Sequence, residues 1–179
     1  EELARQYAVD RKRIYITGHS NGGAMSHRMA CDHADLIAGI ASLAGMTFLD
    51  PNTRRPSQPV NVLQIHGTAD EIVPYAGGAL LGGLPVVALF PGAVTTVQTW
   101  ASLNGSQGPQ WDPLPSMDLD LAVAGIDTTV MRYTNCPPGG AVELWTINGG
   151  LHTPTLFSGT TNSEYSARVI DWLLAHPKP

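Results

Sequence analysis

A short glycine-rich turn, Gly18–Gly22 (GHSNG), separates a predicted strand from a predicted helix. The run before it, Arg13–Thr17 (RIYIT), is rich in the β-branched and aromatic residues that favour strands. The run after it, residues 22–31, reads as a helix whose first turn carries no bulky side chain. The turn fits the pattern Gly-x-Ser-x-Gly, in which a serine hydroxyl is exposed at the tip of a tight strand-to-helix turn. We therefore expect Ser20 at that tip, with no room for a side chain at either flanking glycine; a serine that only caps the helix is the alternative.

Strand-like and helix-like segments alternate along the rest of the chain. Strands are predicted at residues 36–43, 60–66, 129–133 and 141–147, and helices at residues 1–8, 93–103 and 162–175. The last helix is expected to open with a Thr161–Glu164 capping box and to bury a stripe that includes Ile170 and Leu174. Residues 74–92 and 106–127 show no periodicity and are expected to be irregular. This alternation predicts a single α/β domain over residues 1–179, with a mainly parallel sheet flanked by helices.

Charge and hydropathy argue against several classes of partner. The chain has 179 residues, a size for one ordinary domain, and its formal net charge is −5. A weakly acidic chain with no basic run is a poor candidate for binding nucleic acid or an anionic membrane. No apolar stretch approaches the roughly 18 residues that a membrane span needs. No cluster of metal-ligating residue types stands out, so we expect no nucleic acid, membrane or metal.

A serine hydroxyl is a poor nucleophile at its normal pKa, so the turn needs a general base nearby. Of the six histidines, His152 lies in a glycine-flanked loop directly after the predicted strand 141–147, from where it can reach the turn. The imidazole in turn needs an orienting carboxylate, and Asp70 follows the predicted strand 60–66 in the same way. Its neighbour Glu71 is the alternative carboxylate. The structural alternatives are a surface-loop histidine and an aspartate that forms a local turn.

Three sequence blocks carry a resemblance to a known family: GHSNGGAMSHRMAC, IHGTADEIVPYAGG and ELWTINGGLHTP. They resemble the polyhydroxybutyrate depolymerase and feruloyl esterase family of α/β-hydrolases, which includes LpqC-like secreted esterases. The order Ser, Asp, His along the chain is also that of α/β-hydrolases. The resemblance implies a truncated α/β-hydrolase fold, secretion, and hydrolysis of carboxylic esters through an acyl-enzyme without a cofactor. It implies Ser20 as nucleophile, Asp70 as acid, His152 as base, and the backbone N–H of Asn21 as one oxyanion donor.

The chain departs from the family pattern in two places. Family members carry a further N-terminal segment, which holds early strands and the loop that gives the second oxyanion donor. Without it, the predicted strand near residues 13–17 has an open edge, and such edges tend to pair with another chain. We therefore expect a homodimer or higher assembly through this edge, with a fragment whose partner piece lies elsewhere as the alternative. The family also has a cysteine where Ser106 stands, so Cys136 lacks its implied partner, and both pairing with Cys31 and two thiols stay open.

Two aromatic residues close in sequence to the expected acid and base, Tyr75 and Phe157, are candidates for lining a substrate pocket. The main hypothesis is a serine esterase acting on small-molecule or polymeric esters, with short-chain, aromatic (such as feruloyl) or polyester acyl groups. The alternative is a catalytically silent or fragmentary hydrolase remnant that works as an assembly or binding module. The missing oxyanion segment favours the alternative, and the complete set of three catalytic residue types argues against it.

Overall fold

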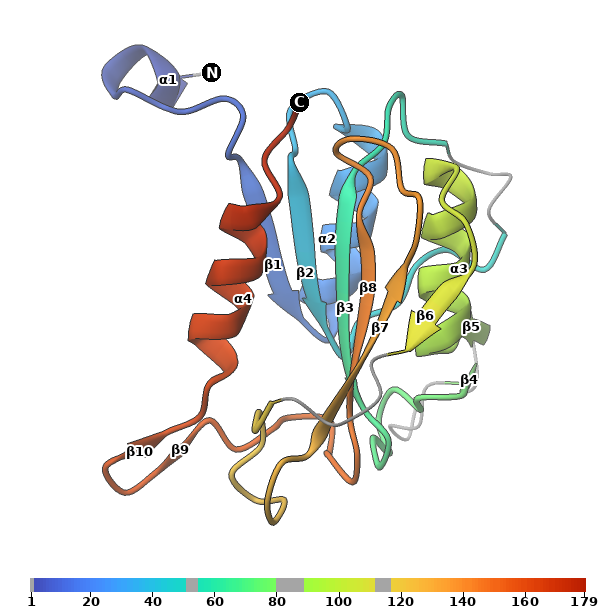
Figure 1. The fold of residues 1–179 in the computed structure, drawn as a ribbon, viewed down its shortest axis with the longest axis vertical. Helices are drawn as coiled ribbons and strands as arrows, with labels where there is room; N and C mark the ends of the chain where they lie inside the picture. Colours follow the sequence, from blue (N-terminus) through green and yellow to red (C-terminus); the bar gives the residue numbers. More distant parts are fainter. Residues whose placement is uncertain (1, 51–54, 80–88, 112–116) are drawn as a thin grey trace.

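A six-stranded sheet forms the centre of the molecule, with strand order β1-β2-β3-β8-β7-β6 (Figure 1). The computed structural model describes residues 2–50, 55–79, 89–111 and 117–179. The sheet strands are Tyr15–His19 (β1), Gly39–Leu43 (β2), Asn61–Gly67 (β3), Pro109–Trp111 (β6), Thr128–Tyr133 (β7) and Val142–Ile147 (β8). Neighbours from β1 to β8 pair in parallel, whereas β7 and β6 add an antiparallel edge. The predicted mainly parallel α/β sheet is confirmed.

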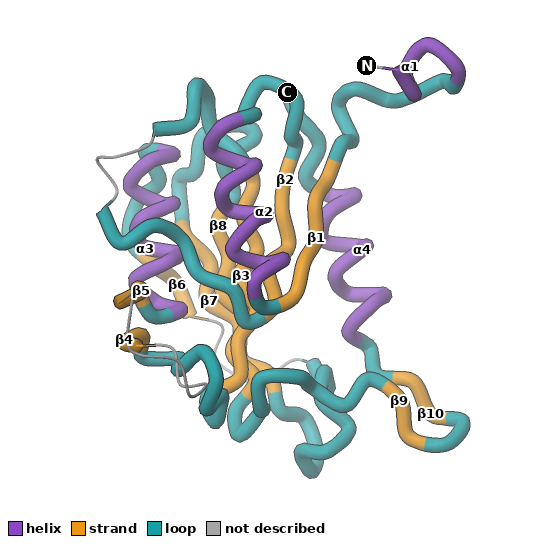
Figure 2. Tube along the Cα trace, turned by 180° about the vertical axis from the view of Figure 1, so that it is seen from behind, coloured by secondary structure: helices purple, strands orange, loops and turns teal. Residues whose placement is uncertain are grey.

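Helices cover both faces of this sheet. Helices Asn21–Asp32 (α2) and Ala93–Asn104 (α3) pack on one face and Tyr165–Ala175 (α4) on the other, as Figure 2 shows from behind. Because strands β2, β3 and β8 lie between these layers, every residue in them is buried, which explains the nearly continuous apolar sequence of β2. Strand β1 lies at the end of the described sheet and is only half-buried. The short helix Glu2–Gln6 (α1) precedes it.

The start of α4 differs from the prediction. Thr161–Asn162 (β10) pairs with Phe157–Ser158 (β9) in a hairpin, so the helix begins only at Tyr165, after Glu164 in the N-cap position and without a side-chain cap hydrogen bond. The predicted capping box is therefore wrong. The predicted buried stripe is also partly wrong, because Ile170 and Leu174 are more than half exposed. Trp172 is the large side chain that faces the sheet, and its position turns those two residues outward.

The two segments expected to be irregular contain short strands. Gly77–Ala79 (β4) pairs with Leu89–Pro91 (β5) in the first, and β6 lies in the second. Residues 80–88 and 112–116 of these segments lie outside the described residues. The predicted end of α3 at Asn104 is confirmed, because Gly105 adopts a left-handed conformation with φ of 76° and its N–H bonds back to the last turn.

Two further expectations concern the cysteines and membranes. No disulfide joins Cys31 to Cys136, both of which lie in described segments, and Cys31 is buried in the core. Among the residues that the structure describes, no helix has the length and apolar character needed to cross a bilayer.

Candidate active site

The glycine-rich turn joins β1 to α2, with Ser20 at its tip. Ser20 has φ of 57° and ψ of −121°, a left-handed conformation that a residue other than glycine rarely adopts. Its N–H donates to the Leu43 carbonyl at 2.8 Å, which fixes the turn against the end of β2. The Ser20 side chain makes no hydrogen bond that caps α2, so the alternative role as a helix cap has no support. A strained, half-buried serine held by a scaffold is a typical feature of a functional site.

The glycines around the serine have unequal roles. A Cβ added at Gly18 would lie 2.3 Å from the Gly22 carbonyl group, so the predicted steric requirement holds there. A Cβ at Gly22 would meet nothing within 4 Å, so the same prediction for Gly22 is wrong. The close approach lies one residue further on, where a Cβ at Gly23 would be 2.7 Å from Ser42 Oγ. The helix therefore packs onto β2 through Gly23.

Gly18→Ala and Gly22→Ala are expected to have opposite effects. Gly18→Ala must push the helix away from the strand, which should lower the unfolding free energy by about 1–3 kcal/mol and disturb Ser20. Gly22→Ala has space and improves helix propensity, so stability should stay equal or rise by up to about 1 kcal/mol. Urea unfolding of both variants measures the difference. Equal destabilisation by the two changes would contradict the geometry.

His152 and Asp70 meet beside this turn. Asp70 follows β3 and His152 follows β8, two parallel neighbours in the sheet, so their loops leave the same edge. The His152 Nδ1–H donates to Asp70 Oδ2 at 2.8 Å. The two loops are in backbone contact, because a Cβ added at Gly67 would lie 2.2 Å from the Gly150 carbonyl oxygen. Ala69 N–H donates to that same oxygen at 2.9 Å, which ties the acid loop to the base loop.

The Asp70 carboxylate is buried and surrounded by donors. Oδ1 accepts hydrogen bonds from the backbone N–H groups of Ile72 (2.9 Å) and Val73 (2.8 Å). Oδ2 lies 3.2 Å from His66 Nε2 as well as 2.8 Å from His152 Nδ1. Burial alone would raise the pKa of Asp70, but these four donors outweigh it and lower the pKa to about 2. The group is therefore a carboxylate at neutral pH and can orient an imidazole.

His19, next to the serine, makes a contact that the sequence did not predict. Its Nε2–H donates to the backbone carbonyl of His152 at 2.8 Å, and the two rings lie 4.8 Å apart. This hydrogen bond connects the serine turn to the loop that carries the base. Since His152 donates through Nδ1, its Nε2 is the ring nitrogen left to accept a proton. The arrangement has the parts needed for proton transfer from a serine hydroxyl.

The remaining predicted site residues lie in different surroundings. Asn21 is the first residue of α2, where backbone N–H groups have no partner within the helix. The Tyr75 hydroxyl is hydrogen-bonded to Thr146 Oγ1 at 2.8 Å, and its ring packs edge-on against His66. Phe157 is 71% exposed on the β9–β10 hairpin, beside a different cavity from the one at His152. Glu71, the alternative to Asp70, is exposed and makes no contact with His152 among the hydrogen bonds of the described residues.

A shallow apolar cavity lies directly beside His152. It has a volume of about 280 Å³ and is lined by Ala69, Glu71, Ile72, Leu151, His152 and Thr153. Ile72 and Leu151 are large apolar side chains that are about half exposed there. Exposed apolar residues next to a reactive group are what an acyl or alcohol group of a substrate would contact. The sequence analysis did not identify these two residues.

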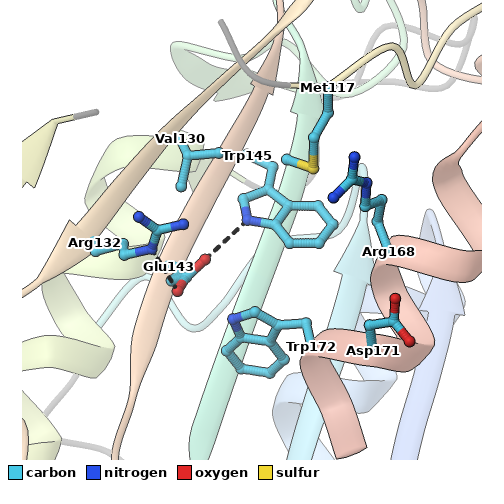
Figure 3. A pocket seen from close by; sticks show the side chains of 8 residues that line it. All are labelled: Met117, Val130, Arg132, Glu143, Trp145, Arg168, Asp171 and Trp172. Atoms are coloured by element: carbon cyan, nitrogen blue, oxygen red, sulfur yellow. Dashed lines mark hydrogen bonds and ion pairs between the residues drawn. The ribbon is translucent and has the colours of Figure 1, made fainter. Parts of the chain in front are cut away.

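A larger cavity of about 350 Å³ lies elsewhere, between the far face of the sheet and α4 (Figure 3). It is lined by Met117, Val130, Arg132, Glu143, Trp145, Arg168, Asp171 and Trp172. Its Trp145 donates to Glu143, which in turn accepts from Arg132, so these three lining side chains are bonded to one another. Ser20, Asp70 and His152 do not line it, so the larger volume does not coincide with the predicted site residues. In the described segments, no three His, Cys, Asp or Glu side chains are grouped as a metal would require.

Comparisons with known proteins point to esterases. A sequence profile of the family described as Phospholipase/Carboxylesterase matches residues 1–83. Feruloyl esterase B of Piromyces equi is 34% identical over 85% of this chain and 27% of that protein. Feruloyl esterase D of Neurospora crassa is 24% identical over 89% of this chain and 47% of that protein. This chain thus spans less than half the length of these curated relatives.

A solved structure gives the same fold. An acetyl xylan esterase from Aspergillus awamori superimposes with a TM-score of 0.57 at 13% sequence identity, over 96% of this chain and 62% of that one. At this level of identity the likeness concerns the fold alone.

Proposed function

We propose that this chain, which has an α/β-hydrolase fold, is a serine esterase that cleaves carboxylic esters through an acyl-enzyme. In this proposal Ser20 is the nucleophile, His152 the general base and Asp70 the orienting acid. The observation that carries the proposal is the 2.8 Å hydrogen bond from His152 to a buried carboxylate, on a loop that also contacts the serine turn. A silent binding module would have no physical need for this pairing.

The proposed reaction has two steps. His152 Nε2 takes the proton from Ser20 Oγ as that oxygen attacks the ester carbonyl carbon, and the Asp70 carboxylate stabilises the imidazolium that forms. The backbone N–H of Asn21 donates to the developing oxyanion. The alcohol then leaves with the proton from Nε2, giving the acyl-enzyme. A water molecule activated by the same nitrogen attacks this ester, and Ser20 regains its proton as the carboxylic acid leaves.

We propose neutral esters with a short or aromatic acyl group, including feruloyl esters, as substrates. The apolar side chains of Ile72 and Leu151 beside His152 suit an uncharged acyl or alcohol group. The Glu71 carboxylate at the same cavity disfavours an anionic substrate. The names of the feruloyl esterase relatives support the aromatic acyl group. A contribution of Tyr75 and Phe157 to substrate binding remains part of this proposal.

Ester hydrolysis combined with covalent labelling tests the proposed function. Purified protein is incubated with p-nitrophenyl acetate, p-nitrophenyl butyrate and methyl ferulate, and separately with a fluorophosphonate. Turnover above the blank, together with one phosphonyl group on the peptide that contains Ser20, is the expected result. No turnover and no labelling would favour the silent remnant instead.

We further propose a homodimer or higher assembly through the β1 edge, and secretion. Strand β1 ends the described sheet, and its residues Thr17 and His19 are exposed, so backbone groups remain there for pairing with another chain. Light scattering over a range of protein concentrations is expected to give at least twice the mass of one chain. A single-chain mass at every concentration would contradict the assembly.

A further inference from the structure

Two histidines share one oxygen of the Asp70 carboxylate. His152 Nδ1 lies 2.8 Å and His66 Nε2 3.2 Å from Oδ2. The His66 side chain is almost fully buried, and its Nε2 also lies 2.8 Å from the Val73 carbonyl oxygen. A carbonyl oxygen only accepts, so His66 must carry its proton on Nε2. The one Nε2–H of His66 is therefore shared between the Val73 carbonyl oxygen, its nearer acceptor, and Asp70 Oδ2, the oxygen that His152 also contacts.

A buried series of hydrogen bonds leads to His66 from the side chains of α3 and α2 that face the core. Trp100 Nε1–H on α3 donates to His27 Nδ1 at 2.8 Å, and His27 Nε2 lies 3.0 Å from Gln64 Oε1. Gln64 Nε2 donates to His66 Nδ1 at 3.2 Å. All four side chains have at most 1% of their surface exposed. Water therefore cannot replace these hydrogen bonds. The ring nitrogen that carries the proton in each histidine is set by the neighbouring side chain in the series.

The contacts at both ends of this series of hydrogen bonds fix the same direction of proton donation along it. The Trp100 indole can only donate, so His27 Nδ1 accepts and its Nε2 donates to the Gln64 amide oxygen. The Gln64 amide nitrogen is held independently, because it also donates to the Gly45 carbonyl at 2.9 Å. His66 Nδ1 must then accept, which leaves Nε2 as its donor, the same result that Val73 requires from the other end. Burial lowers the pKa of His27 to about 4, which keeps that ring neutral at physiological pH.

We propose that His66 is a positioning residue of the triad, whose Nε2–H, fixed by the chain Trp100–His27–Gln64, holds the Asp70 carboxylate in the orientation that His152 requires. The inference rests on the proposed esterase function and extends it. Without this donor, His152 is the one side chain among the described residues that still donates to Asp70 Oδ2. The carboxylate can then rotate while Oδ1 keeps its hydrogen bonds to the backbone N–H groups of Ile72 and Val73. Other polar or charged groups near the pair are His19 and Glu71 beside His152, and Tyr75, which packs its ring against His66.

The exchange of His66 for leucine and for glutamine tests the role of the Nε2–H. His66→Leu removes the donor and is expected to lower kcat roughly tenfold to a hundredfold with little change in KM. Because Asp70 then becomes a stronger acceptor for His152, the acid limb of the kcat/KM profile should shift to higher pH. His66→Gln places an amide N–H near the Nε2 position, so it should restore most of kcat and return the acid limb towards the wild-type position.

A stability control and a spectroscopic measurement complete the test. Val169→Ala removes buried volume on the other face of the sheet and should leave kcat and the pH profile unchanged. Histidine ¹⁵N NMR of the wild type is expected to show His27 and His66 protonated at Nε2 and His152 at Nδ1. It should also show a His152 Nδ1 proton that exchanges faster in His66→Leu than in His66→Gln.

Three results would overturn the positioning role: unchanged kcat and acid limb in His66→Leu, no recovery in His66→Gln, or a His66 proton on Nδ1. If the wild-type protein hydrolyses no ester, the proposed function fails. The NMR measurements then decide the positioning role alone.

Discussion

Replacing Ser20 with alanine is expected to abolish ester turnover and to leave folding stability almost unchanged. Loss of the nucleophile of a triad lowers kcat by about 10⁶-fold. The Ser20 side chain makes no cap hydrogen bond to α2, and alanine tolerates the left-handed backbone no worse than serine does. The unfolding free energy should therefore stay within about 0.5 kcal/mol of the wild type. Steady-state hydrolysis of p-nitrophenyl butyrate and urea unfolding measure the two effects.

Ser26 provides a matched control on the same helix. It is fully buried, and its hydroxyl donates to the Gly22 carbonyl at 2.9 Å, away from solvent. Ser26→Ala should keep ester turnover near that of the wild type. Turnover that survives Ser20→Ala would show that another group performs the attack. A marked loss of stability in Ser20→Ala would instead support the helix-cap role.

Asp70→Asn is expected to lower kcat by about 10⁴-fold, the size of effect that a wrong histidine tautomer has in such triads. Four donors converge on the two carboxylate oxygens, so an amide NH₂ must face a donor in either orientation. The two backbone N–H groups at Oδ1 cannot change, so the amide nitrogen should turn towards the histidines. His152 would then have to accept through Nδ1 and carry its proton on Nε2, where it cannot receive the Ser20 proton.

Glu71→Gln is the matched control for this change. Glu71 is the next residue, also acidic, but it is exposed and lines the cavity beside His152. Its loss should change kcat by no more than a few-fold, because its charge is screened by solvent. Comparable losses of kcat in Asp70→Asn and Glu71→Gln would mean that activity depends on negative charge near His152 and does not require the hydrogen bond from His152 to Asp70.

Asp70 should also contribute to stability in a defined pH range. The pKa of Asp70 is lowered from its ordinary value to about 2 in the folded protein, because four donors outweigh the effect of burial, so the carboxylate form favours folding. The contribution, about 2 kcal/mol, is fully present above the unfolded-state pKa and disappears as pH falls through the folded-state pKa. The difference in unfolding free energy between the wild type and Asp70→Asn should therefore narrow between about pH 4 and pH 2. A difference that stays constant over this range would contradict the shift.

The fold and the proximity of Asp70 to His152 could be predicted from the sequence because each depends on local patterns. The continuous apolar run at residues 36–43 indicates a strand buried on both faces. Asp70 and His152 each come just after another predicted strand, and the ends of parallel strands meet at one edge of the sheet. The hydrogen bond between them follows from that topology. The same reasoning identified the end of α3, since a glycine in a left-handed conformation is a local signal.

The features that could not be predicted depend on contacts between distant segments. Whether Gly22 or Gly23 approaches β2 depends on the rotation of α2, which the motif does not specify. His19 and His66 gain their partners only when separate loops meet, so their sequence neighbours give no sign of it. The start of α4 was misplaced because β9 and β10 form a hairpin whose pairing competes with the helical pattern.

The contact of Gly67 with Gly150 limits which residues of such a site can be substituted during evolution. Asp70 and His152, the proposed acid and base, lie on two loops whose backbones touch. The two loops therefore form a single unit that has almost no room for an added atom at this contact. The serine turn belongs to a different pair of elements and meets this unit through His19. Adaptation to a new substrate is therefore expected at the surfaces that flank the unit, such as Ile72 and Leu151, where side chains can grow or shrink without separating the two catalytic loops.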